Sequence, residues 1–88
     1  MASYKIHWKE SAERELRSID RQQIPRIIET VSTLSNDPYP TQHRKLFGSE
    51  SSYRIRIGDY RVIYQVNTQQ KIIFIYHVRH RKDVYRKM

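Results

Sequence analysis

The spacing of the apolar residues divides this chain into two unlike halves. Residues 4–8 alternate between apolar and polar side chains, which predicts a short strand. Residues 9–19 and residues 24–34 carry apolar side chains at helical spacing and predict two amphipathic helices. Residues 20–23 resemble a capping box before the second helix, and residues 36–38, which read Asn-Asp-Pro, end that helix.

In the second half of the chain, apolar residues again recur at every second position. Three strands are predicted there, at residues 53–57, 60–66 and 72–79. Residues 37–52 form a long polar connection between the two halves. This order of elements, strand–helix–helix followed by three strands, predicts an α+β domain. We expect a helical pair on one face of a mostly antiparallel four-stranded sheet, with residues 1–88 as a single domain.

A two-residue turn fixes the register of the first hairpin of this sheet. Gly58 and Asp59 suit a type II′ turn, which places Arg56 opposite Arg61 and Arg54 on the same face. The other face then carries the apolar side chains and is the predicted core. Two arginines directly opposite each other repel. The pairing therefore predicts an anion-binding platform, with a solvated basic face as the alternative.

The register of the last strand depends on the length of the turn after Val66. An even-length turn places Tyr76 opposite Arg61 and adds to the arginine face Ile72, Phe74, Val78 and His80. An odd-length turn instead places His77 and Arg79 on that face. In either register the strand ends in a basic cluster, Arg79, His80, Arg81 and Lys82. Aromatic rings beside guanidinium groups suit stacking on unpaired RNA bases.

The distribution of charge indicates the kind of partner. The chain has 17 Lys and Arg residues against nine Asp and Glu residues, a net charge of +8. Residues 1–42 hold six of each sign, so the whole excess, eleven bases against three acids, lies in residues 43–88. A polyanion such as nucleic acid is the simplest partner for this excess. A basic surface without a specific partner is the alternative.

The sequence argues against several other classes of function. It has no cysteine, which excludes disulfides and thiolate metal sites. His7, His43 and His77 lack the spacing of metal ligands, and no glycine-rich phosphate loop is present, so neither a metal nor another cofactor is expected. The longest apolar run, residues 72–76, is too short to cross a membrane. Residues 1–5 show no signal peptide, so a cytoplasmic location is expected.

The C-terminal tail contributes candidates for proton transfer. If residues 82–88 form a helical turn, Tyr85 returns beside Arg81 at a spacing of four residues. Nearby cations favour the phenolate form, which would make Tyr85 a general base. His80 is the other candidate for this role. The competing interpretation is a Tyr85 ring that only packs on the sheet.

Three segments carry a family resemblance: KLFG at residues 45–48, YRIRIGDYRVIYQV at residues 53–66 and HRKDVY at residues 80–85. Together with the order of elements, they resemble the RelE/ParE toxin superfamily of bacterial type II toxin–antitoxin systems, and its RelE branch in particular. The resemblance implies a small RelE-like fold with a short C-terminal tail. It also implies cleavage of mRNA in the ribosomal A site, whereas ParE-like relatives share the fold but inhibit DNA gyrase.

The resemblance further implies roles for single residues. The implied catalytic residues are Arg61, His80, Arg81 and Tyr85. The implied RNA phosphate ligands are Arg54 and Arg56, and the basic cluster at the end of the last strand adds Arg79 and Lys82 as expected phosphate ligands. The best-known RelE-like toxins have lysines where this chain has Arg54 and Arg56. Because arginine is permanently charged and fork-shaped, these two residues suit phosphate binding rather than proton transfer.

The implied reaction is a metal-independent endoribonuclease step. Tyr85 or His80 deprotonates the 2′-hydroxyl, which attacks the adjacent phosphorus while arginines neutralise the equatorial oxygens. Arg81 or His80 assists departure of the 5′-oxygen. The implied partners are mRNA, the 70S ribosome and a cognate RelB-like antitoxin in a toxin–antitoxin hetero-oligomer. Two alternatives remain: a ParE-like gyrase inhibitor without nuclease activity, and a non-catalytic RNA-binding module.

Overall fold

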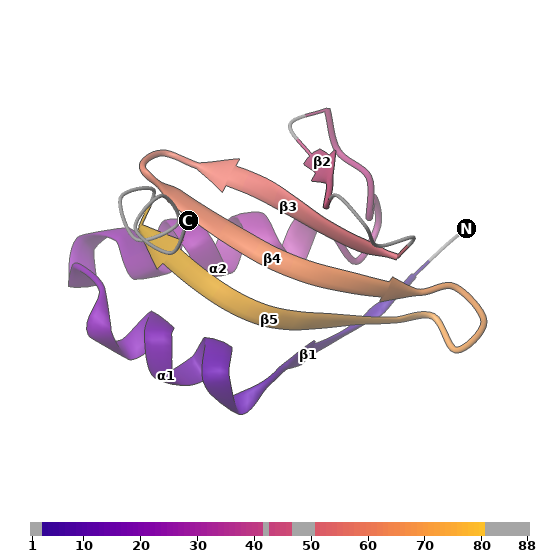
Figure 1. Cartoon of the computed structure of the whole chain (residues 1–88), viewed down its shortest axis with the longest axis horizontal. Helices are drawn as coiled ribbons and strands as arrows, with labels where there is room; N and C mark the ends of the chain where they lie inside the picture. The colour runs from indigo at the N-terminus through magenta and orange to yellow at the C-terminus, as the bar shows by residue number, and fades with distance from the viewer. Residues whose placement is uncertain (1–2, 42, 47–50, 81–88) are drawn as a thin grey trace.

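The computed structural model describes residues 3–41, 43–46 and 51–80 (Figure 1). Within them the chain forms two α-helices, a short 3₁₀ turn (η1) and a five-stranded sheet. In chain order the elements are β1 (Lys5–Trp8), α1 (Glu10–Ser18), η1 (Arg21–Gln23), α2 (Ile24–Thr33), β2 (His43–Lys45), β3 (Ser52–Ile57), β4 (Tyr60–Asn67) and β5 (Ile72–His80). The strand order across the sheet is β1-β5-β4-β3-β2.

The predicted α+β architecture is confirmed, with one strand more than expected. β1 pairs parallel to β5, and every other pair of neighbouring strands is antiparallel. The additional strand, β2, lies inside the segment that the sequence predicts as a polar connection. Its three residues, His43–Lys45, have no apolar alternation, because β2 is an edge strand held by pairing to β3.

The core lies between one face of the sheet and the two helices, and the other face is left open (Figure 1). The sheet side chains that it buries are Ile55, Ile57, Val62, Tyr64, Val66, Ile73, Ile75 and Val78. The helices and the turn after α2 contribute Ala12, Ile27, Val31 and Leu34. The apolar periodicities therefore identify the buried faces of α1, α2, β3 and β4 correctly.

The β3–β4 hairpin has the predicted register. Arg56 pairs with Arg61, and the tight turn between the strands consists of Gly58 and Asp59. Gly58 has a φ of +60° and Asp59 does not have a positive φ, as a type II′ turn requires. An added Cβ at Gly58 would lie 3.2 Å from Nη1 of Arg26, so a side chain at this position meets both backbone strain and a neighbour.

A β-bulge divides β5 into two registers. Before the bulge, Phe74 pairs with Gln65 and therefore lies on the arginine side of the sheet, as the even-length turn predicts. After it, Arg79 pairs with Arg61, as the odd-length turn predicts. Tyr76 is the extra residue: Ile75 pairs with Tyr64, whereas His77 already pairs with Ile63.

The bulge makes part of the even-register prediction wrong. Tyr76 does not lie opposite Arg61, because that position belongs to Arg79. Val78 and His80 do not share the arginine face either. Val78 is buried in the core, and His80 pairs with Tyr60 on the same side of the sheet. The physical reason is the single inserted residue, since a shift of one residue moves every later side chain to the other face.

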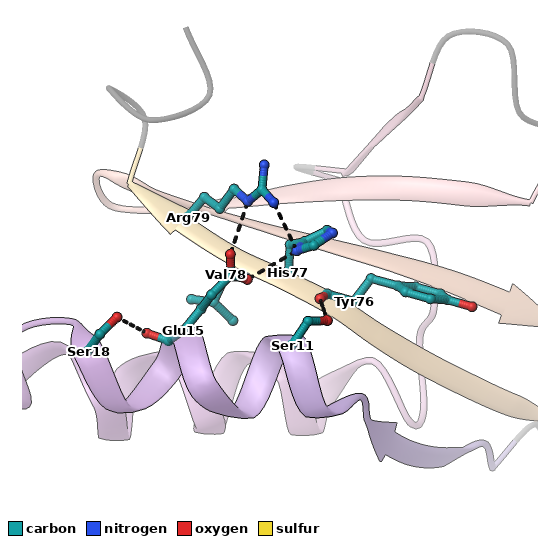
Figure 2. A network of polar contacts seen from close by, with 7 residues as sticks. All are labelled: Ser11, Glu15, Ser18, Tyr76, His77, Val78 and Arg79. Atoms are coloured by element: carbon teal, nitrogen blue, oxygen red, sulfur yellow. Dashed lines mark hydrogen bonds and ion pairs between the residues drawn. The ribbon is translucent and has the colours of Figure 1, made fainter. Parts of the chain in front are cut away.

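Side chains of α1 cover the part of β5 that β1 does not reach. β1 ends at Trp8, opposite Ile75. Beyond that point Ser11 Oγ donates a hydrogen bond to the Tyr76 carbonyl oxygen at 2.7 Å, and the Val78 amide donates to Glu15 Oε1 at 3.0 Å (Figure 2). These contacts satisfy backbone groups on a strand edge that would otherwise be open to pairing with another chain.

The predicted capping box opens a 3₁₀ turn rather than the second helix itself. Asp20 Oδ1 accepts a hydrogen bond from the Gln22 amide at 3.1 Å, which caps η1. α2 begins at Ile24 with Pro25 in its first turn, where the missing amide proton leaves no hydrogen bond unmade.

The Tyr64 phenol ties the central strand to the segment after α2. Its ring is fully buried, and its Oη donates a hydrogen bond to the Pro38 carbonyl oxygen at 2.7 Å. Burial, followed by the nearby Tyr53, Tyr39 and Asp37, raises the pKa of Tyr64 far above its usual value. The folded state therefore holds this phenol in its neutral form.

Replacement of Gly58 by alanine is expected to destabilise the domain. Forcing a side chain into the positive-φ region costs about 1–3 kcal/mol of unfolding free energy. Urea unfolding measures this loss, and Asp59→Ala, at the exposed second turn position, is the control with a change within about 0.5 kcal/mol. Equal effects of the two substitutions would contradict the turn geometry.

Tyr64→Phe is expected to cost about 1–2 kcal/mol at pH 7, because the buried Pro38 carbonyl loses its donor. Above about pH 10 the unfolded chain releases the Tyr64 proton but the folded chain retains it, so wild type loses up to about 1.4 kcal/mol per pH unit from this group. The variant lacks this loss, so the difference in unfolding free energy between wild type and Tyr64→Phe should become smaller from pH 10 to pH 11. Urea unfolding at each pH tests this, with Tyr60→Phe as the control; a constant gap would refute it.

Candidate functional site

A row of three arginines crosses the open face of the sheet on three adjacent strands. Arg56 of β3, Arg61 of β4 and Arg79 of β5 are successive cross-strand partners. A second pair, Arg44 of β2 and Arg54 of β3, lies beside this row on the same face. Because neighbouring strands are only about 4.8 Å apart, the five guanidinium groups belong to one surface. We call these five side chains the arginine platform.

Four members of the platform line a hollow of about 260 Å³: Arg44, Arg54, Arg56 and Arg61. Arg44, Arg54 and Arg56 are exposed, whereas Arg61 is half-buried at the base. Arg56 Nε donates to the Gly58 carbonyl oxygen at 3.2 Å, and Arg44 Nη1 donates to the His43 carbonyl oxygen at 3.0 Å. Among the described residues, no carboxylate forms an ion pair with any of these four.

The most informative atom of the hollow is Nη1 of Arg61, which is buried and has no hydrogen-bond partner within the described part of the chain. A buried donor without a partner costs about 1–3 kcal/mol, more if it is charged. Adjacent like charges add repulsion. An anion with several acceptor oxygens, such as a phosphate group, would satisfy this donor and screen the repulsion at once.

Arg79, the end of the row, differs from the other members because a carboxylate neutralises it. Its Nε donates to Glu15 Oε2 at 3.1 Å, and only 20% of its side chain is exposed. Glu15 lies on α1, 64 residues away in the sequence. No local sequence signal identifies this contact, because it depends on how α1 packs against the edge of β5.

His80, a predicted catalytic residue, is not brought together with Arg61. It lies on the helix side of the sheet, where its ring meets Tyr60 edge to face at 5.3 Å between centroids. It lines a different hollow, of about 340 Å³, together with residues that include Asp20, Arg26 and Asp59. The other predicted residues of this segment, Arg81, Lys82 and Tyr85, lie outside the described residues, and their roles stay predictions.

Aromatic side chains continue the open face beyond the arginine platform. Lys9 Nζ lies 5.6 Å from the ring centroid of Phe74 and 5.7 Å from that of Tyr76. Tyr76 Oη donates to Gln65 Oε1 at 3.2 Å. The cation over these two rings is therefore an ammonium group, and the expected stacking of aromatic rings beside guanidinium groups stays a prediction.

Arg44 is the member of the hollow that sequence reasoning missed. Its partner Arg54 was identified from the hairpin register, but Arg44 lies on the unpredicted strand β2. The one available signal is its place in the basic second half of the chain, which does not distinguish it from other arginines there.

Across residues 3–41, 43–46 and 51–80, His, Asp and Glu side chains do not gather in any group of three able to hold a metal ion. None of the helices in these ranges is both long and apolar enough to span a membrane.

Comparison with known proteins places the chain in a family. A family model described as the ParE toxin of the type II toxin–antitoxin system parDE matches residues 6–85. A curated Methanocaldococcus jannaschii protein with the name RelE1 is 30% identical over 76 residues, which cover 83% of this chain and 84% of that protein.

Solved structures share the fold. In a RelE–RelB complex from Pyrococcus horikoshii, the matching chain is 32% identical with a TM-score of 0.79, over 90% of this chain and 96% of that one. A YoeB/ParE toxin from Agrobacterium tumefaciens, 16% identical, has a TM-score of 0.72 over 86% of this chain and 96% of that one, a likeness of fold alone. Because the family model covers nearly the whole chain and a curated relative supports it, this protein belongs to the RelE/ParE superfamily of toxins of type II toxin–antitoxin systems.

Proposed function

We propose that this toxin is an endoribonuclease that cuts mRNA in the ribosomal A site. The observation that carries the proposal is the hollow of the arginine platform, with the unpartnered Nη1 of Arg61 at its base. A single phosphodiester linkage would supply the negative charge and the acceptor oxygens that are missing from this hollow. RelE-named relatives at 30% and 32% identity favour the RelE branch.

The proposed reaction uses the 2′-hydroxyl of the RNA as the nucleophile. Its proton passes to a general base, for which Tyr85 is the expected residue, and the oxygen attacks the adjacent phosphorus. The bond from phosphorus to the 5′-oxygen breaks, leaving a 2′,3′-cyclic phosphate and, after the leaving oxygen takes up a proton, a 5′-hydroxyl. Arg61, with Arg54 and Arg56, neutralises the charge that grows on the equatorial oxygens.

Among the basic residues near the end of β5, Arg79 is the one that fits this step by position. It is the cross-strand partner of Arg61, whereas His80 lies on the other side of the sheet. Arginine keeps its protons at neutral pH, so Arg79 would act as a hydrogen-bond donor to the reacting phosphate group rather than as a proton source. Arg81 and Lys82 would extend the contact with the RNA backbone.

Dependence on the ribosome follows from the composition of the hollow. All four lining side chains are arginines, so this part of the site supplies charge neutralisation but no efficient base. Free RNA would seldom hold its 2′-oxygen in line with the leaving oxygen. A 70S ribosome that fixes the message in near-attack geometry would supply the missing orientation.

A cognate antitoxin is the proposed partner in the resting cell. RelE toxins of Pyrococcus horikoshii and Methanococcus jannaschii have been solved in complex with RelB. By analogy, an acidic segment of a RelB-like antitoxin would neutralise the arginine platform in a hetero-oligomer. A cytoplasmic location belongs to the same proposal, since mRNA and ribosomes are found there.

Gyrase inhibition is the second candidate, favoured by the name of the matching family model, which is that of ParE toxins. Gyrase inhibition would need a protein interface rather than a phosphate site. The two candidates therefore differ in whether the arginine platform is required.

Arg61→Ala is expected to lower the rate of A-site cleavage about 100- to 1,000-fold, the usual cost of removing one donor to a transition-state anion. Arg61→Lys should recover part of this loss, because it restores charge without the fork. Primer extension on programmed ribosomes measures the cuts. Arg14→Ala removes an exposed arginine of α1 and should cleave like wild type.

Intact message under these conditions, together with inhibited supercoiling by DNA gyrase, would replace the nuclease proposal by the gyrase candidate. Binding of RNA without cleavage and without an effect on gyrase would leave a non-catalytic RNA-binding module.

Arg44→Ala tests the residue that only the structure identifies. For single-stranded RNA, each phosphate contact contributes about 0.7 to the slope of log K against log salt concentration. Fluorescence anisotropy measures the binding of an uncleavable 2′-O-methyl RNA at several salt concentrations. Arg44→Ala should make the slope less steep by about 0.7. The matched variant Arg14→Ala should leave the slope unchanged; equal slopes for both variants would remove Arg44 from the binding site.

A further inference from the structure

Glu15 is the one carboxylate among the described residues that forms an ion pair with the arginine platform. Its Oε1 accepts from the Val78 amide at 3.0 Å and lies 3.1 Å from His77 Nδ1, and its Oε2 accepts from Arg79 Nε at 3.1 Å (Figure 2). The carboxylate is therefore held at both oxygens, and one of its donors is a backbone group of the strand that carries Arg79.

The contact engages Arg79 through Nε and leaves the terminal nitrogens of the guanidinium group to other partners. Figure 2 shows one terminal nitrogen pointing away from α1, whereas the other is joined by a dashed line to His77. Nη2 lies 3.2 Å from His77 Nδ1. A carboxylate that bound the two terminal nitrogens as a fork would occupy the edge that anions prefer, and Glu15 leaves this edge free.

His77 Nδ1 lies between a group that only accepts hydrogen bonds, Glu15 Oε1, and a group that only donates them, Arg79 Nη2. It can donate to Glu15 or accept from Arg79, but one ring nitrogen cannot do both. When Nδ1 carries the proton, Arg79 keeps both terminal nitrogens for an external acceptor. When it does not, His77 holds Nη2 in place beside the Glu15 contact.

Arg79 needs such a fixed partner because of its position. Its cross-strand neighbour is Arg61, and two guanidinium groups directly opposite each other repel. Without compensation, a long flexible side chain would turn toward solvent, where its charge is screened. Among the described residues, the side chains of Glu15 and His77 contact Arg79 and oppose this movement.

We propose that Glu15 is a positioning residue of the active site, which acts through Arg79. It holds the Arg79 guanidinium group at Nε so that the terminal nitrogens face a phosphate group bound at Arg61. The proposal rests on the proposed nuclease function and adds to it a residue of α1 that does not itself touch RNA. It also assigns α1 a role beyond covering the edge of β5.

The test compares Glu15→Gln with Glu13→Gln, which removes the same charge from the exposed side of the same helix. Glu15→Gln is expected to lower the single-turnover cleavage rate about 10- to 100-fold, the order expected for a misplaced catalytic group. The toxin concentration that gives the half-maximal cleavage rate should stay within about twofold of the wild-type value, because the other arginines retain their phosphate contacts. Glu13→Gln should match wild type in both quantities.

A double-mutant cycle separates positioning from a structural role. If Glu15 acts through Arg79, Glu15→Gln should have no further effect on the cleavage rate in an Arg79→Ala background. A loss of the same size in both backgrounds would mean that Glu15 supports the fold in general, and would overturn the proposal. Thermal unfolding of each variant shows whether a partial loss of structure contributes.

A spectroscopic readout keeps this test independent of the nuclease function. In ¹H–¹⁵N spectra, the Nε–H signal of Arg79 should be protected from exchange in wild type and lose that protection in Glu15→Gln, with Glu13→Gln unchanged. An unprotected signal in wild type would refute the positioning contact itself. If wild type protects the signal but does not cut message on ribosomes, the proposed function fails while the contact stands, and the positioning proposal is withdrawn with it.

Discussion

The two-residue turn at Gly58 and Asp59 is the constraint on which the site depends. A strand alternates its side chains between faces, so a slip of one residue would bury the arginines and expose the core. The positive φ of Gly58 excludes most other residues, and the II′ geometry leaves no extra residue to absorb a slip. The turn therefore aligns Arg56 with Arg61 and sends Ile55, Ile57 and Val62 into the core at the same time.

Electrostatic compensation is distributed unevenly over the platform that results. At one end, Glu15 neutralises Arg79 within a network of hydrogen bonds. At the other end, four guanidinium groups line a hollow with no carboxylate beside them in the described part of the chain, and the most buried of them has a nitrogen without a partner. Such an arrangement costs stability in the free protein, and an anion bound in the hollow would offset this cost.

How much of this could be read from the sequence differs from element to element. The hairpin register, and with it Arg54, Arg56 and Arg61 on one face, follows from a local turn and a period of two, and it is confirmed. The sequence allows two registers for β5, and each holds for half of the strand, because a bulge at Tyr76 adds one residue. Bulges depend on packing against neighbouring strands, and a period of two along one strand carries no sign of them.

The sequence by itself determined what depends on near neighbours: the helices, the tight turn, the sorting of apolar and basic side chains to opposite faces, and the family. Tertiary structure alone decided the pairing of β2 with β3, the placement of Arg44 in the hollow, the position of His80 on the helix side and the contact of Glu15 with Arg79. The reason is physical, since local preferences act over a few residues. A contact between residues 64 positions apart forms only when packing of the whole domain makes it favourable.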